Sequence, residues 1–411
     1  MESKLDLIEL AKYHHYLRKC TNRDRQKSLF RKVFKHFSDY VLKFSNLTIA
    51  RLNHVRKLED CDILVVITSV VDYSQTESLW TALENKGYKI SIVIDKSKNL
   101  MKSAFLSKVS SKIPACLVPF ASFASLLIKR HNPKLICVFA HFDVLPSFLR
   151  NFSNAKTIYI PHAIMDSSYL YSSIDYDYYF VFGESSLVNL KENKNKFGKT
   201  KLVKTGSPVI RESYKLQRTT PNHNLLFFST WSIGKDKNLT ANFHLLLDFI
   251  AKHQDFKLFI KPHPKEDTTY IENAVEKIIN IQILDKKVDM VTALGTASIV
   301  ITNYSTASIE ATLLNRPVVV VNMFDLDETS TDFRISDKYL YLENYFPSRA
   351  KTIDEIEDRI FQVLENYDYY LDQCKEFSKF HLETFTDSVE KIANIIEEIY
   401  HNNEQFTFEE I

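Results

Sequence analysis

Glycine is scarce in this chain, and its scarcity limits how a phosphate can be bound. The 411 residues include six glycines, whereas an average protein contains roughly 7% glycine. None of the six falls in a GxGxxG or GxxxxGKS/T pattern, which excludes the glycine-rich loops that usually hold phosphates. Any phosphate must therefore be held by hydroxyl side chains, helix termini, histidine, lysine or arginine.

Paired cysteines and long hydrophobic runs are also missing. The five cysteines are scattered and form no CxxC pair, which indicates reduced thiols in a cytoplasmic protein and no metal site. The first residues lack the apolar core and cleavage site of a signal peptide. The most apolar stretch, residues 113–128, contains two prolines and is shorter than the ~20 residues of a membrane-spanning helix. A membrane span is therefore not expected.

Positive charge is concentrated near the start of the chain. Thirteen lysines and arginines lie between Lys12 and Lys57 against two acids, whereas the whole chain carries a net charge of +2. Apolar residues recur at helical spacing from Leu29 to Phe44, which predicts a basic amphipathic helix. Two interpretations stay open: the apolar stripe packs on the domain behind it, or it binds an acidic surface such as a membrane. No nucleic-acid recognition motif accompanies it, so nucleic acid is not an expected partner.

Strands and helices alternate from Cys61 onward, which predicts an α/β protein with doubly wound parallel sheets. The expected strands are 62–68, 89–94, 115–118, 135–140, 157–160, 178–182, 225–229, 256–261, 281–284, 299–302 and 317–321. The expected helices are 74–86, 239–253, 270–280, 307–314, 353–367 and those within 369–400.

The chain is expected to divide into domains at a polar, aperiodic stretch with two prolines, residues 207–224, which reads as a linker. The predicted parts are a basic helical extension (1–57), a Rossmann-like acceptor domain (58–206), a Rossmann-like donor domain (225–367) and C-terminal helices (368–411). The ligand-binding edge of each domain is expected to face a common cleft.

The segment from Ile299 to Asn322 carries the clearest site signal. Two β-branched runs flank a short helix, which predicts a parallel βαβ unit. Its hydroxyl-rich turn follows the first strand, at the edge where open α/β sheets bind ligands. Ser305 and Thr306 lie where the helix begins, so two hydroxyls and unpaired backbone N–H groups would suit a phosphate. A single hydroxyl there would more simply cap the helix.

Other polar residues surround this turn or follow other strands. Glu310, one turn into the helix, either reaches a ribose hydroxyl or pairs with Arg316. In Lys261-Pro-His263-Pro264 the prolines fix an extended loop after a strand, from which His263 could bond a pyrophosphate oxygen or protonate a leaving phosphate. Lys261 supplies positive charge nearby.

A second Pro-His pair follows the strand 157–160 in the first domain and places His162 at the same kind of loop. A base from one domain and a phosphate-binding histidine from the other would suit group transfer. Asp166 either orients His162 or caps a helix. His141 and Asp143 end the strand 135–140 and could line the acceptor side.

These motifs, in this order, resemble the CDP-glycerol:poly(glycerophosphate) glycerophosphotransferase family. The resemblance runs from about Leu135 to Phe324 and rests on Pro161-His162, Lys204-Thr-Gly206-Ser-Pro208, Phe227-Phe-Ser-Thr-Trp231, Lys261-Pro-His263-Pro264, Thr302-Asn-Tyr-Ser-Thr306 and Arg316-Pro317. The family comprises teichoic-acid and capsule polymerases with the GT-B glycosyltransferase fold. The resemblance implies that His162 is the general base on the acceptor hydroxyl and that His263 contacts the donor pyrophosphate.

The implied activity is transfer of a glycerophosphate unit from a CDP- or CMP-activated donor to a hydroxyl of a polymer or lipid-linked acceptor of the cell surface. No metal cofactor is expected. Such an enzyme works at the cytoplasmic face of the membrane, where the basic segment would suit peripheral association with anionic lipid. The residues expected to hold nucleotide or phosphate are Lys261, Asn303, Ser305, Thr306, Glu310, Gly206 and Thr230.

Departures from the family pattern leave other transferred groups open. His162 is followed by Ala163 and no nearby lysine, and Ser232 stands where the family has arginine after Thr-Trp. The alternatives are a related polyol phosphate, a CMP- or UDP-sugar-dependent capsule glycosyltransferase similar to sialyltransferases, a relative of UDP-N-acetylglucosamine 2-epimerases, and a catalytically inactive GT-B scaffold.

Overall fold

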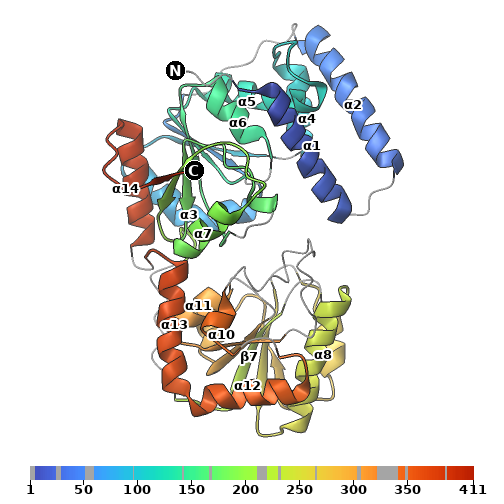
Figure 1. Cartoon of the computed structure of the whole chain (residues 1–411), viewed down its shortest axis with the longest axis vertical. Helices are drawn as coiled ribbons and strands as arrows, with labels where there is room; N and C mark the ends of the chain where they lie inside the picture. The colour runs from blue at the N-terminus through green and yellow to red at the C-terminus, as the bar shows by residue number, and fades with distance from the viewer. Residues whose placement is uncertain are drawn as a thin grey trace. The chain divides into compact units, whose positions relative to one another are not determined.

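The computed structural model forms two compact units, shown in Figure 1. Unit 1 comprises Met1–Val209 together with Asp387–Ile411, and unit 2 comprises Ile210–Thr386. The residues described are 5–24, 29–50, 60–95, 97–140, 143–165, 169–210, 220–229, 233–263, 266–302, 307–321, 341–347, 350–384 and 387–411.

Unit 1 contains a seven-stranded sheet in the order β12-β6-β5-β4-β3-β1-β2. Its neighbouring strands pair in parallel, except that β12 runs antiparallel to β6. β1 and β3 are buried along their whole length, as expected of parallel strands that are covered on both faces. The strands are β1 (Ile63–Ile67), β2 (Ile90–Ile94), β3 (Leu135–Val138), β4 (Lys156–Tyr159), β5 (Tyr178–Val181), β6 (Lys201–Lys204) and β12 (Glu409–Glu410).

Helices cover both faces of this sheet and form two separate apolar cores. They are α3 (Val70–Asn85), α4 (Ser97–Leu106), α5 (Val118–His131), α6 (Leu145–Phe152), α7 (Glu184–Glu192) and α14 (Ser388–His401). α14 lies beside α3 (Figure 1), and its isoleucines Ile392, Ile396 and Ile399 join the core that contains Trp80 of α3. The C-terminal helices, expected as one segment, are therefore divided between the two units.

The basic N-terminal segment forms α1 (Leu7–Asp24) and α2 (Leu29–Thr48), which pack on unit 1. Leu10 and Leu42 are buried in one of its cores. Asn46 is 1% exposed, and its amide group donates to the backbone O of Ala104 (2.7 Å) and Ser107 (2.8 Å). A buried amide satisfied in this way fixes α2 on α4 and the loop after it. Of the two interpretations, packing on the domain behind it is confirmed for this face of α2.

Unit 2 contains a five-stranded parallel sheet in the order β11-β10-β7-β8-β9. The strands are β7 (Asn224–Phe228), β8 (Lys257–Lys261), β9 (Ile281–Ile283), β10 (Ile299–Thr302) and β11 (Val318–Val320). The predicted βαβ unit is confirmed as β10, α11 and β11. The helices are α8 (Lys237–Lys252), α9 (Thr269–Val275), α10 (Met290–Leu294), α11 (Ala307–Leu313), α12 (Ile353–Glu365) and α13 (Tyr367–His381).

One predicted strand is wrong. Residues 115–118 were expected to be extended, but Ala115–Leu117 form a 3-10 turn that leads into α5. Pro119 lies in the first turn of α5, where its fixed φ and missing N–H favour a helix start. A short apolar run does not distinguish a strand from a buried helix by periodicity alone. Among the described helices, α5 included, none is long and apolar enough to cross a membrane.

Candidate functional site

In unit 1, the loop that follows β4 carries His162. The residues on its C-terminal side anchor this loop, because Ile164 and Met165 are fully buried. Asn189 of α7 donates from its amide to the backbone O of Met165 (2.8 Å). His162 itself is partly buried between Pro161 and this anchor. The loop therefore holds an imidazole at the carboxyl end of β4, the edge at which doubly wound sheets bind ligands.

Two carboxylates lie at the same edge of this sheet. Asp143 follows β3, and Asp95 follows β2 directly. The backbone N–H of Leu145 donates to Asp143 Oδ1 (2.8 Å), so this carboxylate also holds the start of α6. Burial raises the pKa of Asp143 to about 6. Burial, with repulsion from Asp143, raises the pKa of Asp95 to about 7. Asp143 was predicted from the sequence, whereas Asp95 was not, because no motif surrounds it.

In unit 2, Lys261 ends β8 with a buried ammonium group. The side chain is 8% exposed, and its Nζ donates to the backbone O of Lys286 (2.8 Å), which follows β9. Within the described residues, Lys261 has no ion pair. Burial lowers its pKa, and Asp285 and Asp289 act in the opposite direction. The charge of Lys261 thus lies at the carboxyl edge of the sheet, where Asp285 and Asp289 are near enough to act on its pKa.

His263 lies two residues beyond Lys261 and is held by Glu266. The backbone N–H of His263 donates to Glu266 Oε2 (3.2 Å), and the N–H of Glu266 donates to the backbone O of His263 (2.9 Å). The hydroxyl of Ser229, the residue after β7, donates to the same Oε2. Glu266 therefore joins the loops that follow β7 and β8. Glu266 was not among the residues predicted from the sequence.

Glu310 was expected either to reach a ribose hydroxyl or to form an ion pair with Arg316, and the structure bears on the second expectation. Glu310 lies one turn into α11 and is partly buried. Arg316 is 1% exposed, and its guanidinium donates to backbone oxygens that include those of Leu294 (3.0 Å), Ala297 (2.7 Å) and Leu314 (2.8 Å). Since these donors are directed at carbonyls, the expected alternative of a Glu310–Arg316 ion pair is wrong. Arg316 instead satisfies the ends of α10 and α11.

The remaining predicted residues are distributed as follows. Gly206 follows β6 with φ +81°, a conformation that favours glycine. It belongs to unit 1, whereas Lys261, which was also expected to contact the nucleotide, belongs to unit 2. Six predicted residues lie outside the described part of the chain: His141, Asp166, Thr230, Asn303, Ser305 and Thr306.

An Asp-x-Asp pair, Asp175 and Asp177, was also not among the predicted residues. Both contact Arg150: Asp175 at 2.7 Å from Nη1 and Asp177 at 3.3 Å from Nε. They precede β5 and so lie at the amino end of the sheet. This is the edge opposite to that of His162, so these acids are not part of the candidate site.

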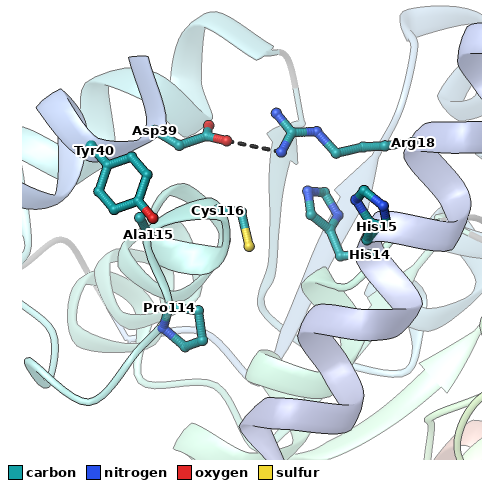
Figure 2. A pocket seen from close by; sticks show the side chains of 8 residues that line it. All are labelled: His14, His15, Arg18, Asp39, Tyr40, Pro114, Ala115 and Cys116. Atoms are coloured by element: carbon teal, nitrogen blue, oxygen red, sulfur yellow. Dashed lines mark hydrogen bonds and ion pairs between the residues drawn. The ribbon is translucent and has the colours of Figure 1, made fainter. Parts of the chain in front are cut away.

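A pocket of about 170 Å³ lies between the N-terminal helices and the turn before α5 (Figure 2). Arg18 of α1 donates to Asp39 of α2 (2.8 Å) across it, and His14 and His15 project from the same face of α1. None of the residues predicted for the site lines this pocket.

Residues 199–398 match the model of the family described as CDP-Glycerol:Poly(glycerophosphate) glycerophosphotransferase. The family resemblance is confirmed. The matched range includes Lys261, His263 and Glu266, whereas His162 lies before it. The match supports a glycerophosphotransferase or glycosyltransferase enzyme. No curated protein sequence matches the chain.

Solved structures share the fold at low sequence identity. S. aureus MnaA with UDP is 14% identical, with a TM-score of 0.56 over 84% of this chain and 98% of that chain. UDP-GlcNAc 2-epimerase from Neisseria meningitidis is 12% identical, with a TM-score of 0.53 over 82% of this chain and 100% of that chain. The glycotransferase of kitacinnamycin is 13% identical, with a TM-score of 0.53 over 82% and 98%. These likenesses confirm the predicted GT-B-like α/β fold and establish nothing further.

Proposed function

We propose that this protein transfers a glycerophosphate unit, or a related polyol phosphate or sugar, from a CDP- or CMP-activated donor to a hydroxyl of a cell-surface polymer. The observation that carries the proposal is the buried ammonium of Lys261 at the carboxyl edge of unit 2, inside the segment that matches the family model. Lys261 has no ion pair among the described residues, a buried charge that lacks one is costly, and a donor pyrophosphate would supply the opposite charge.

The two histidines would divide the reaction between the two units. His263, next to Lys261, would donate a hydrogen bond to the donor phosphate and stabilise the charge that develops on the leaving group. His162, at the corresponding edge of unit 1, would accept the proton of the attacking hydroxyl. The acceptor oxygen then bonds to the transferred group while the bond to the nucleotide phosphate breaks, and the nucleotide leaves with the electron pair.

Removing the hydroxyls of Ser305 and Thr306 is expected to weaken CDP binding. The double variant Ser305→Ala/Thr306→Ala should lose about 1–3 kcal/mol of binding free energy, since hydrogen bonds to a charged phosphate would be removed. Calorimetric titration with CDP measures this loss. Thr292→Ala, which removes an exposed hydroxyl of α10, is the matched control.

Unchanged CDP affinity in the double variant would show that these hydroxyls do not bind phosphate. The same titration with CMP and UMP distinguishes the alternatives. Preference for a cytosine nucleotide supports a CDP- or CMP-activated donor, preference for UMP supports a UDP-sugar enzyme, and no binding of any nucleotide supports a scaffold.

We also propose that the protein associates with an anionic membrane surface through α2. On the side of this helix away from the core, Tyr40 is 69% and Phe44 70% exposed, and Val41 is about half exposed. These apolar side chains stand in the segment that carries the chain's excess of positive charge. Apolar residues among basic ones are typical of helices that lie in a lipid interface.

The variant Tyr40→Ser/Phe44→Ser is expected to lower binding to vesicles that contain anionic lipid. The two exposed rings contribute apolar insertion, and each basic residue near the surface contributes about 1 kcal/mol of attraction. Vesicle co-sedimentation measures binding, which added salt should also reduce. Ile279→Ser, at a 96% exposed apolar position of unit 2, is the control. Equal binding by both variants and the wild type would contradict the assignment to α2.

A further inference from the structure

The carboxyl group of Glu266 is buried within unit 2 at the junction of two loops. The side chain is 3% exposed, and its Oε2 accepts from the Ser229 hydroxyl and from the His263 N–H. Its Oε1 is buried and has no hydrogen-bond partner among the described residues. Burial raises the pKa of Glu266, and the hydrogen bonds from Ser229 and His263 oppose that rise.

Two lysines extend this contact to a third strand end. The ammonium of Lys286, which follows β9, donates to the backbone O of Glu266 (2.5 Å). The ammonium of Lys261 donates in turn to the backbone O of Lys286 (2.8 Å). The N–H of Ser229 closes the ring by donating to the backbone O of Lys261 (3.2 Å). The ends of β7, β8 and β9 are therefore linked through one buried carboxyl group and two ammonium groups.

We propose that Glu266 is a positioning residue for donor binding: its carboxyl holds the backbone of His263 against the end of β7 and so fixes where the imidazole meets the donor phosphate. This inference rests on the proposed function. His263 has prolines on both sides, so its backbone cannot recover a lost hydrogen bond by entering a helix. The bond from the His263 N–H to Glu266 therefore sets the loop geometry, and an imidazole displaced by about 1 Å would lose alignment with its target.

A double-mutant cycle in CDP binding tests the proposal. His263→Ala and Glu266→Ala should each weaken CDP binding roughly 10–100-fold, because a missing and a displaced imidazole lose the same charged hydrogen bond. In the His263→Ala background, Glu266→Ala should add less than about twofold, since residues that act through one another are not additive. Glu266→Gln keeps an oxygen acceptor for Ser229 and His263 and should stay within about threefold of the wild type.

The controls separate positioning from general stability. Glu272→Ala removes an exposed carboxylate of α9 and should bind CDP as the wild type does. Thermal unfolding checks every variant, and if Glu266→Ala unfolds, Glu266→Asp takes its place in the cycle because its shorter side chain cannot reach both loops. Additive losses in the cycle, or full affinity in the Ala and Asp variants, would overturn the proposal. A wild type that binds no CDP would instead refute the proposed function.

Discussion

Replacing His162 with alanine is expected to lower turnover by roughly 10²–10⁴-fold, the usual contribution of a general base. The affinity for CDP should hardly change, because His162 belongs to unit 1, whereas Lys261 and His263 belong to unit 2. His263→Ala should lower both turnover and affinity. Initial rates at saturating donor, together with calorimetric titration of CDP, distinguish the two results.

The fold should survive the His162 substitution, because buried Ile164 and Met165 and the hydrogen bond from Asn189 to Met165 anchor the loop. His15→Ala, which removes an exposed imidazole of α1 in the same unit, is the matched control and should be fully active. If the His162 and His263 variants lose turnover and affinity in the same proportion, the division of labour between the two units is wrong.

The variant Asp95→Asn is expected to gain stability over the wild type as the pH rises. The rise of the Asp95 pKa from 3.8 to about 7 means that the folded protein holds a proton that the unfolded chain releases, a difference worth up to ~4 kcal/mol. This contribution is fully present below pH 3.8 and is lost as the pH rises through 7. Asparagine cannot ionise, so the variant does not lose stability in this pH range as the wild type does.

Urea unfolding at about pH 4 and about pH 8 measures this effect. The free energy of unfolding of Asp95→Asn, relative to the wild type, should increase by about 2–4 kcal/mol between the two pH values. Asp62→Asn is the control and should show little change relative to the wild type over this range: burial raises the pKa of Asp62, but hydrogen bonds from Tyr400 and the Lys89 N–H outweigh it and lower the pKa below 3.8, so its contribution is present at both pH values and is lost only at lower pH. A pH-independent difference for Asp95→Asn would show that its carboxyl is not protonated in the folded protein.

Periodicity and β-branched runs predict most of the two sheets to within a few residues. The strand 299–302 matches β10, and 281–284 is β9 with one residue fewer. β6 was not predicted, because Lys201–Lys204 has charged residues at both ends and only two buried apolar ones. Its pairing with β5 decides its structure, and such a tertiary contact is not visible in a window of sequence.

The residues of the candidate site also fall into those that a local sequence signal predicts and those that it does not. His162 and His263 carry a local signal, a proline beside a histidine after an apolar run. Glu266 carries none, since its partner Ser229 lies 37 residues away and meets it only when β7 and β8 pair. Asp95 and Asp143 follow β2 and β3, the two strands that flank β1, so their proximity also depends on how the strands pair. Groups that act through strand adjacency therefore escape sequence analysis.

The return of α14 to unit 1 has a consequence for how the protein is made. Unit 2 is an insertion in the sequence of unit 1, and the last segment of unit 1 leaves the ribosome only after all of unit 2. Until then the apolar surface around Trp80 lacks Ile392, Ile396 and Ile399. Domains generally fold as units during synthesis, and exposed apolar surface on an incomplete one favours aggregation. Unit 2 can therefore fold while the apolar surface around Trp80 still lacks the helix that covers it.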